Sequence, residues 1–510
     1  KVFLGQEYRH TDRDNQTFNG YGYQFERGGT AFTDYRIIQK AIQENSPYFE
    51  KGFSKERGIA FFLQGTYTYD NRYVFAGTAN YEGSNQLGRS RSARWLPTWN
   101  VSGRWNASNE SFLKDNTKIS NLAFRVSYGL IAGLGAASNA LAVFKNGVAN
   151  RYNIGDRENI IEIDDLQNMD LTWEKVYETN VGIELGLFKN RINLSLDLYQ
   201  KNSKDLIDLV RTSGIGGEIT KLANNATMVT KGIELALDTK NIKTDDVSWN
   251  TGINFAYFNQ EITSLLYKPN VFNLVREVGG NVVGGARNTL YSYDFRGLND
   301  KGLPVFNLRN GSTDYADIDF QNRQDILSYL KKEGAVEPNL TAGLSNTFKY
   351  KNWEFSFLIT ASAGNKIRKA DQYTVDYNDL SVFPKEMKNR WVRTGDEKIT
   401  NIPSIPSKFT LNEVGEGTLR RVYNAYNHST ARVVDGSFIR MKSMSLSYTF
   451  AKDVLDALHV NNLTLRLQAT NPFLIYAHKD LNGQDPEFFR TGGVAYPVSA
   501  QYTFTINLGI

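Results

Sequence analysis

The histidines are the side chains most able to hold a metal ion or to transfer a proton near neutral pH. His10, His428, His459 and His478 show none of the spacings that place several metal ligands together. No Ser-His-Asp triad and no pair of catalytic carboxylates can be assigned from spacing alone. The sequence therefore predicts no catalytic residue, no metal site and no cofactor, with the histidines at ordinary loop or turn positions.

Two further stretches have residue types that bind ions or phosphates. Asp314, Asp317 and Asp319 form a loose acidic cluster, but the glycine and the bidentate glutamate of a calcium loop are missing. The glycine pairs at 279–280 and 284–285 lack the Gly-Lys-Ser/Thr ending and the following helix of a phosphate loop. We expect a solvated acidic loop and a flexible glycine loop.

Tryptophan side chains could stack on sugar rings, and this chain has seven of them. Most are expected at a membrane interface or in loop packing, because tryptophan prefers the boundary between apolar and wet surroundings. Trp391 lies deep within a long polar segment and is the candidate for ligand contact. The others are Trp95, Trp99, Trp105, Trp173, Trp249 and Trp353.

The composition limits the kind of scaffold that could hold these residues. The 510 residues have a mean hydropathy of −0.44 and no apolar run of the length, about 20 residues, that a membrane helix needs. The strands of a membrane β-barrel escape this test because they alternate apolar and polar residues. The net charge is +5 without a long block of like charge, which argues against a nucleic-acid surface. Cysteine is absent, so no disulfide or thiolate metal site is possible within these residues.

The hairpin over Thr179–Tyr199 shows this alternation most clearly. Large apolar residues occupy every second position on both sides of a turn at Lys189-Asn190. These residues are Val181, Ile183, Leu185, Leu187, Ile192, Leu194, Leu196 and Leu198. The intervening positions are polar or glycine, which suits a wet lumen better than a packed core.

The last ten residues repeat the pattern, with Tyr502, Phe504, Ile506, Leu508 and Ile510 on one face. Strands of this length suit a tilted membrane strand of about 9–11 residues better than a sandwich strand of about 5–6. We interpret the apolar face as a C-terminal assembly strand. Candidates for the lumen-facing, substrate-binding side chains by the same alternation are Asn193, Ser195, Asp197, Arg466 and Gln468.

Pattern counting predicts about 14 antiparallel strands, with the first residues and the last ten forming the two terminal ones. The others are placed at 58–69, 72–81, 94–105, 121–131, 171–187, 192–199, 230–237, 247–258, 340–350, 353–363, 437–450 and 463–470. Short connections alternate with long ones at about 9–57, 132–170, 259–339, 364–435 and 471–500. An outer-membrane barrel has this asymmetry of short periplasmic turns and long extracellular loops. The alternation places Ile510 on the periplasmic side.

Several motifs in order resemble the SusC-like (SusC/RagA) TonB-dependent outer-membrane transporters of the Bacteroidetes. The most specific are Asp435–Phe450 (DGSFIRMKSMSLSYTF), Leu463–Phe473 (LTLRLQATNPF) and Gly483–Glu487 (GQDPE). Leu171–Gly182 (LTWEKVYETNVG), Tyr67–Arg72 (YTYDNR) and Ala361–Lys366 (ASAGNK) also match the family's pattern.

The resemblance implies a plug inside a 22-stranded barrel, a SusD-like surface lipoprotein as lid, and the TonB–ExbB–ExbD motor. It implies import of oligosaccharides or oligopeptides across the outer membrane, in contact with outer-membrane lipid and lipopolysaccharide. Residues 1–510 contain no recognisable plug or TonB box, and 14 strands fall short of 22. We therefore expect the chain to be the C-terminal part of the barrel, and Ile510 stands where the family usually ends in an aromatic residue.

Other readings of the sequence stay open at this point. A 14-stranded barrel standing alone is the structural alternative. A passive porin or a structural or adhesin barrel is the functional alternative, and a soluble β-rich carbohydrate enzyme or lectin is a third possibility.

Overall fold

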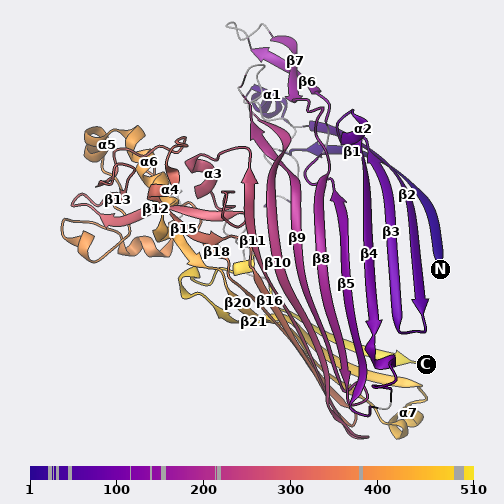
Figure 1. The fold of residues 1–510 in the computed structure, drawn as a ribbon. Helices are drawn as coiled ribbons and strands as arrows, with labels where there is room; N and C mark the ends of the chain where they lie inside the picture. Colours follow the sequence, from indigo (N-terminus) through magenta and orange to yellow (C-terminus); the bar gives the residue numbers. More distant parts are fainter. Residues whose placement is uncertain are drawn as a thin grey trace.

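Fourteen strands form one antiparallel sheet, in which each strand pairs with the next sheet strand along the chain (Figure 1). The computed structural model describes residues 1–20, 26, 28–29, 34–43, 49–114, 116–137, 140–150, 157–212, 214, 220–377, 383–487 and 499–510. The strands are β1 (Val2–Phe18), β2 (Phe49–Tyr69), β3 (Tyr73–Ser84), β4 (Trp95–Asn106), β5 (Ile119–Gly133), β8 (Glu174–Leu187), β9 (Ile192–Arg211), β10 (Thr220–Lys243), β11 (Val247–Leu265), β16 (Leu340–Tyr350), β17 (Trp353–Ala363), β20 (Phe438–Thr449), β21 (Asn462–Ala477) and β22 (Gln501–Gly509). The predicted number and antiparallel order of the strands are confirmed.

Several strands are longer than the alternation predicted. β1 and β2 pair from Val2 with Gly65 to Phe18 with Phe49, so much of the connection predicted between them is a long hairpin. β9 continues to Arg211 and β10 already begins at Thr220, so this hairpin also extends well past the predicted ends. The extension of β1 and residues 200–205 of β9 have polar residues on both faces. Beyond the lipid both faces of a strand meet water, so the apolar alternation that marks a membrane strand ends early there.

The short connections all lie at one edge of the sheet and the long ones at the other (Figure 1). Left-handed backbone at Lys189 and Asn190 confirms the predicted tight turn, and left-handed backbone also forms tight turns at Asp70 and Asn71 and at Lys351. Two of the other short connections contain η2 (Ala107–Asn109) and α7 (Lys452–Leu458), and the connection between β10 and β11 is only residues 244–246. The predicted topology of short turns opposite long loops is therefore confirmed.

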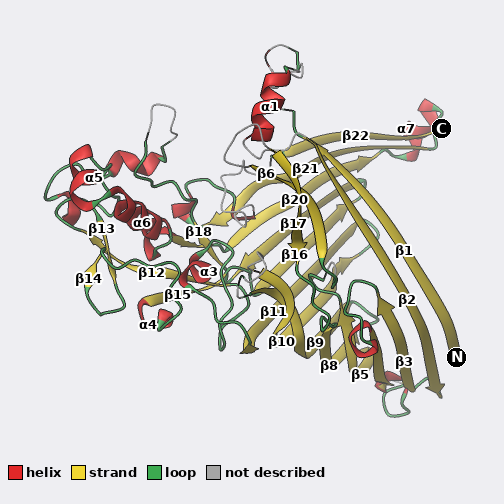
Figure 2. Cartoon of the chain, turned by 90° about the horizontal axis from the view of Figure 1, so that it is seen from above, coloured by secondary structure: helices red, strands yellow, loops and turns green. Residues whose placement is uncertain are grey.

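The sheet is strongly curved, and seen from above its strands follow an open arc (Figure 2). Its edge strands are β1 and β22, and in the described part of the chain they do not pair with each other. The fourteen strands thus form a curved wall that does not close on itself. No helix in the described ranges is long and apolar enough to span a membrane.

One face of this wall carries large exposed apolar side chains. Val181 and Leu198 lie directly opposite each other and are 47% and 49% exposed. Aromatic pairs border this apolar face, with Tyr81 stacked on Trp95 towards the long loops and Trp105 stacked on Phe124 towards the short turns. An exposed apolar band between aromatic girdles is the surface that a membrane strand presents to lipid.

Two of the long connections are folded together rather than extended as loops. Residues 266–339 and 364–437, here called the rim module, share a hydrophobic core that includes Tyr293, Phe306, Tyr423 and Tyr426. The first segment forms α3 (Val271–Val275), β12 (Thr289–Leu298), β13 (Pro304–Asn307), β14 (Thr313–Asp314), α4 (Ile326–Tyr329) and β15 (Leu330–Ala335). The second forms β18 (Lys366–Arg368), η3 (Lys385–Asn389), η4 (Asp396–Lys398), α5 (Lys408–Val414), α6 (Glu416–Asn427), η5 (Thr430–Arg432) and β19 (Val433–Asp435).

The helix α6 shows why the module has a core. Leu419, Val422, Tyr423 and Tyr426 are buried at helical spacing and form one apolar stripe. The first pair of the glycine loop predicted at 279–280 and 284–285 is closely packed. A Cβ on Gly279 would lie 2.6 Å from the Asn288 carbonyl oxygen, and Gly280 forms a β-bridge with Thr289.

The remaining rim elements lie at the same edge of the sheet. They are α1 (Tyr35–Gln43), α2 (Arg91–Arg94), η6 (Lys479–Leu481) and a hairpin of β6 (Val143–Asn150) and β7 (Arg157–Asp165). A small core that includes Leu87, Leu171 and Trp173 packs the connections before β4 and β8 together. Parts of the predicted loops at 9–57, 132–170, 364–435 and 471–500 lie outside the described residues.

Candidate functional site

The face opposite the apolar band is polar, and the strand register places its side chains in rows. Asp197 of β9 lies opposite Glu234 of β10, which lies opposite Ala256 of β11. One row further towards the short turns, Ser195 lies opposite Ala236, and Ala236 lies opposite Asn254. Small and polar side chains on the inner face leave space rather than filling a core, as expected for a lumen wall.

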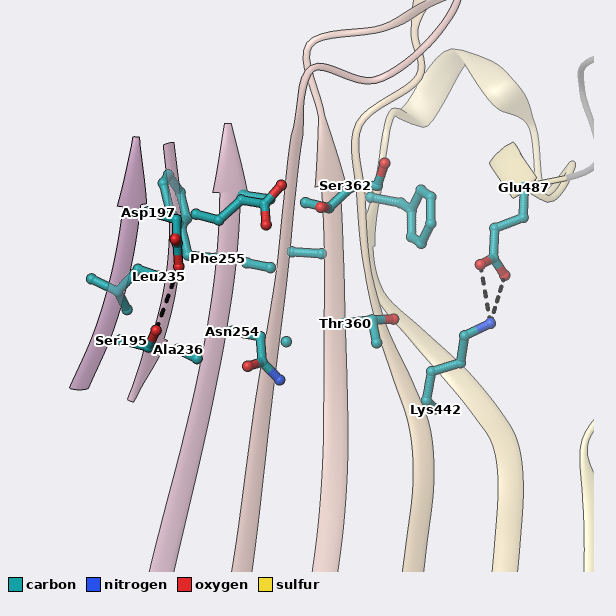
Figure 3. A pocket seen from close by; sticks show the side chains of 17 residues that line it. Ser195, Asp197, Leu235, Ala236, Asn254, Phe255, Thr360, Ser362, Lys442 and Glu487 are labelled. Carbon is teal, nitrogen blue, oxygen red and sulfur yellow. Dashed lines mark hydrogen bonds and ion pairs between the residues drawn. The ribbon is translucent and has the colours of Figure 1, made fainter. Parts of the chain in front are cut away.

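A cavity of about 630 Å³ opens on this polar face (Figure 3). It extends across the wall from β9 to β20, and its polar lining includes Ser195, Asp197, Glu234, Asn254, Thr360 and Ser362. Hydroxyl, amide and carboxylate groups can hydrogen-bond many polar ligands but do not form a catalytic constellation. The arrangement therefore suits the binding of polar ligands.

Beside the cavity, charged side chains from four strands form a chain of ion pairs. Arg104 of β4 binds Glu184 of β8 at 2.6 Å, and Arg125 of β5 binds Asp197 of β9 at 2.8 Å. Arg125 also approaches Glu184 at 3.4 Å. Gly182 of β8 lies between Arg125 and Asp197. It makes their contact possible, because a Cβ at this position would lie 2.6 Å from the Asp197 carboxylate. This charge ladder fixes the orientation of Asp197 at the edge of the cavity.

At the other end of the cavity, a buried charge cluster joins β20 to the connection after β21. Arg440 and Asp485 are each 2% exposed, and their side chains hydrogen-bond each other. Glu487 forms an ion pair with the Arg440 guanidinium at 2.9 Å. It also accepts a hydrogen bond from the Lys442 ammonium at 3.0 Å (Figure 3). We call these four residues the rim clamp. It explains two of the sequence motifs, because GQDPE supplies the acids and DGSFIRMK supplies the bases.

The clamp continues into a smaller cavity of about 300 Å³ under the rim module, which shares Ser362, Phe438 and Glu487 with the first. The motif ASAGNK also contributes here, because its last residue, Lys366 of β18, pairs with Asp435 of β19 at 2.9 Å. Asn365 lies over Gly436, where a Cβ would be 2.3 Å from its amide nitrogen. Three motifs that lie far apart in the sequence therefore meet where the wall joins the module.

Arg368 links the two segments of the rim module. Its guanidinium is fully buried and donates to the carbonyl oxygens of Tyr291, at 2.7 Å, and Ser429, at 3.1 Å. Burial lowers the pKa of Arg368 to about 10, so it remains protonated at neutral pH. The charge is held by carbonyl oxygens from both segments of the module, which binds the two segments together.

A second ion pair in the module joins the buried Arg432 to the partly buried Glu386. Glu386 accepts hydrogen bonds from the Arg432 guanidinium and from the Tyr373 hydroxyl, the latter at 2.8 Å. Burial alone would raise the pKa of Glu386, but the charge of Arg432 and these hydrogen bonds more than offset it, so that the pKa lies below its ordinary value. Burial raises the pKa of Tyr373 well above its ordinary value, so the tyrosine is a neutral donor.

The predicted site residues lie in different places. Asp197 lines the cavity, whereas Arg466 and Gln468 lie on β21 opposite Thr505 and Thr503, away from the residues that line it. Trp391 lies in the rim module, where its indole packs against Gly302 and donates to Glu397 at 3.1 Å. Its role in ligand contact stays a prediction.

On the terminal strand, Tyr502, Phe504, Ile506 and Leu508 are more than half exposed on the apolar face of β22. Ile510 follows the strand and is 92% exposed. The histidines and the acidic cluster form no metal site in the described ranges. His428 is buried at the end of α6, where its Nδ1 lies 2.8 Å from the Asn424 carbonyl oxygen.

Apart from Asp197, the sequence did not single out the residues of the charge ladder, nor did it single out those of the rim clamp. Asp485 and Glu487 were quoted within a motif, but their partners lie 45 residues away in the chain. The signal that could have found the ladder is a charged residue at an inward position of four strands. Arg104 and Glu184 are 80 residues apart, so their contact needs the strand order and not only the alternation.

Comparison with known proteins shows the family. Residues 2–471 match the family described as TonB dependent receptor-like, beta-barrel. The TonB-dependent receptor SusC of Bacteroides thetaiotaomicron is 26% identical over 98% of this chain and 47% of its own length. The TonB-dependent receptor P3 of Formosa agariphila is 25% identical over 84% of this chain and 42% of its own length. The chain thus spans about half the length of the curated relatives it matches.

Solved structures show the same fold. A structure of the RagAB peptide transporter covers all of this chain with 53% of its own chain, at a TM-score of 0.74 and 20% identity. The RagAB peptide importer in its open-open state gives a TM-score of 0.72 at 21% identity. The ordered motifs, the curved antiparallel wall and the match over nearly all of the sequence agree. This outer-membrane β-barrel chain belongs to the TonB dependent receptor-like family.

Proposed function

We propose that the chain is the C-terminal part of the barrel of a TonB-dependent importer for oligosaccharides or oligopeptides. The observation that carries the proposal is the pairing of two surfaces on one wall, a lipid-facing apolar band and a polar cavity on the opposite face. In this proposal the rest of the barrel and the plug are supplied by the part of the protein that its relatives have beyond the matched half. The motor proteins TonB, ExbB and ExbD would act on that plug.

The chain's own residues would bind and orient cargo. A polar ligand that enters from the rim meets Ser195, Asn254 and Thr360, which can hydrogen-bond hydroxyl or amide groups without selecting one cargo strictly. The charge ladder holds Asp197 in place, and the rim clamp holds Glu487 and Lys442 at the opposite side of the same cavity. Both sides of the binding surface are therefore preorganised by fixed ion pairs.

The rim module is proposed to contact a SusD-like lipoprotein lid that encloses the cargo. It has a core of its own, so it can present a defined surface at the edge where the long connections lie. Trp391 is retained as the proposed aromatic contact with cargo, because its ring is partly exposed at the surface of this module.

Uptake by cells that carry the full-length protein tests the proposal. Fluorescently labelled oligosaccharides and oligopeptides are supplied with and without the TonB gene. The proposal predicts uptake that disappears when TonB is deleted and weakens in Asn254→Leu, with Asn241→Leu on the opposite face as the matched control. Uptake that continues without TonB would instead support the alternative of a passive porin, and binding of cells without uptake would support an adhesin barrel.

A further inference from the structure

Three lysines occupy the lipid-facing side of the wall near its extracellular edge. Lys175 of β8 lies directly opposite Lys204 of β9, and Lys231 of β10 lies opposite Gln200 of β9. Their positions have the same parity as Val181 and Leu198, which belong to the exposed apolar band. Successive side chains of a strand alternate between faces, so these lysines lie on the outer face and not in the lumen.

The height of the lysines follows from the length of the strand. From Leu187, beside the short turn, to Tyr177 the chain advances by 187 − 177 = 10 residues of β8. At about 3.3 Å per residue and a tilt of about 40°, this corresponds to roughly 25 Å along the membrane normal. That distance is the height of a barrel's apolar band, so Tyr177 lies at the outer interface and Lys175 and Lys204 lie just above it.

The charges of this lysine group are only partly balanced by the protein. Lys175 binds Asp205 at 2.6 Å, whereas no carboxylate of the described residues lies within 4.0 Å of the Lys204 or Lys231 ammonium groups. Lys204 lies over the Tyr177 ring, 5.4 Å from its centroid. Glu261 is an acidic residue on the same face, but it lies opposite Val229 rather than Lys231. Because Asp205 already pairs with Lys175, the ammonium groups left without a carboxylate partner among the described residues are those of Lys204 and Lys231, and these can bind an external anion.

We propose that Lys204 and Lys231, with Lys175 beside them, bind the phosphate groups of a phosphorylated glycolipid in the outer leaflet. An ammonium group on a flexible stem suits a phosphate as a point charge and can extend up to the headgroup level. The amide side chains Gln200 and Asn259 are exposed on the same face, directly opposite Lys231 on either side. They can hydrogen-bond sugar hydroxyls, which favours a glycolipid over a simple phospholipid.

The experiment measures lipid retained by the full-length transporter in nanodiscs of phosphatidylcholine. The discs contain either diphosphoryl lipid A, dephosphorylated lipid A, or phosphatidylglycerol at matched charge, and retained lipid is counted by native mass spectrometry. The test variant is Lys204→Gln/Lys231→Gln. The matched control is Lys189→Gln/Lys243→Gln, which removes two lysines beside the short turns of the same strands. Heat-modifiable gel migration confirms that all variants are folded.

The inference predicts that the wild type and the control retain diphosphoryl lipid A in preference to the other two lipids. Each lysine at an anionic surface contributes enough for the double test variant to retain it about thirtyfold less well. Equal retention of dephosphorylated lipid A would overturn the role of phosphate. Equal retention of phosphatidylglycerol would overturn the glycolipid assignment, and an equal loss in the control would overturn the assignment to these lysines. Displacement of lipid A by excess inorganic phosphate alone would show a simple phosphate site and would also contradict the proposal.

Discussion

The substitution Arg440→Met tests whether the rim clamp holds the last connection on the wall. Arg440 and Asp485 are each 2% exposed, and Arg440 also lies 2.9 Å from Glu487. Methionine removes the cation and leaves the Asp485 carboxylate buried without its main partner. Breaking a buried pair by removing one partner costs about 3–5 kcal/mol, because the remaining charge is no longer compensated.

Lys366→Met provides the matched control on the neighbouring ion pair. Lys366 and Asp435 are joined at a similar distance, 2.9 Å, but their side chains are 34% and 35% exposed. A pair that water can reach contributes about 0–1 kcal/mol, so this substitution should have little effect. The contrast between the two variants isolates burial, since both remove one base from an acid in the same part of the rim.

The assay is urea unfolding of the full-length protein in detergent, followed by protease cleavage within residues 478–487 under native conditions. We expect Arg440→Met to lower the free energy of unfolding, or of local opening, by about 3 kcal/mol or more. Arg440→Met/Asp485→Leu should recover much of this loss, because it removes the buried charge as well. Equal effects of Arg440→Met and Lys366→Met, with no recovery in the double variant, would refute the reasoning.

Three further predictions concern the ladder, the module and the last strand. Gly182→Ala places a methyl group 2.6 Å from the Asp197 carboxylate, so it should displace the Arg125–Asp197 pair. Transport assays should then show reduced uptake, while unfolding should show a loss of stability of no more than about 1 kcal/mol. Unchanged uptake would contradict a role for the ladder in orienting Asp197. Because the pKa of Glu386 is lower in the folded protein, its contribution to stability is present above the ordinary value of 4.5 and is lost as the pH falls below it. The rim module should therefore become sensitive to protease in acid, and Glu386→Gln should remove that pH dependence; a wild type whose protection does not change with pH would argue against it. Phe504→Asp on the apolar face of β22 should cost about 1–2 kcal/mol and impair assembly, whereas Thr505→Asp, which faces Arg466, should assemble normally on heat-modifiable gels. Equal behaviour of the two would contradict the assignment of faces.

The membrane part of the fold could be predicted from the sequence, because lipid on one side and water on the other impose a strict period of two. The hairpin at Lys189-Asn190 shows this most clearly, since its turn and its apolar positions were both predicted. The strand ends were less predictable. Beyond Tyr199, β9 continues through Lys201 and Lys204, where both faces are polar and the alternation gives no signal.

The rim module could not be predicted, because its core joins segments that are far apart in the chain. Tyr293 and Phe306 pack with Tyr423 and Tyr426, and no local period connects them. The same holds for the cavity, whose lining combines Asp197 with Lys442 and Glu487. Alternation identified Asp197 as facing inward, but only the curvature of the wall shows that it shares a cavity with residues on β20.

The central claim is that one face of this wall meets lipid and the other lines a polar lumen. These 510 residues contain no cysteine. Single cysteines are introduced at positions 193–198 of β9 in a full-length protein in which every cysteine outside these residues has been replaced by serine, and they are spin-labelled in liposomes. Electron paramagnetic resonance then compares collision with oxygen, which concentrates in lipid, and with a water-soluble nickel chelate. The account predicts nickel collisions at Asn193, Ser195 and Asp197 and oxygen collisions at Leu194, Leu196 and Leu198. The same accessibility at all six positions, or the opposite alternation, would contradict it.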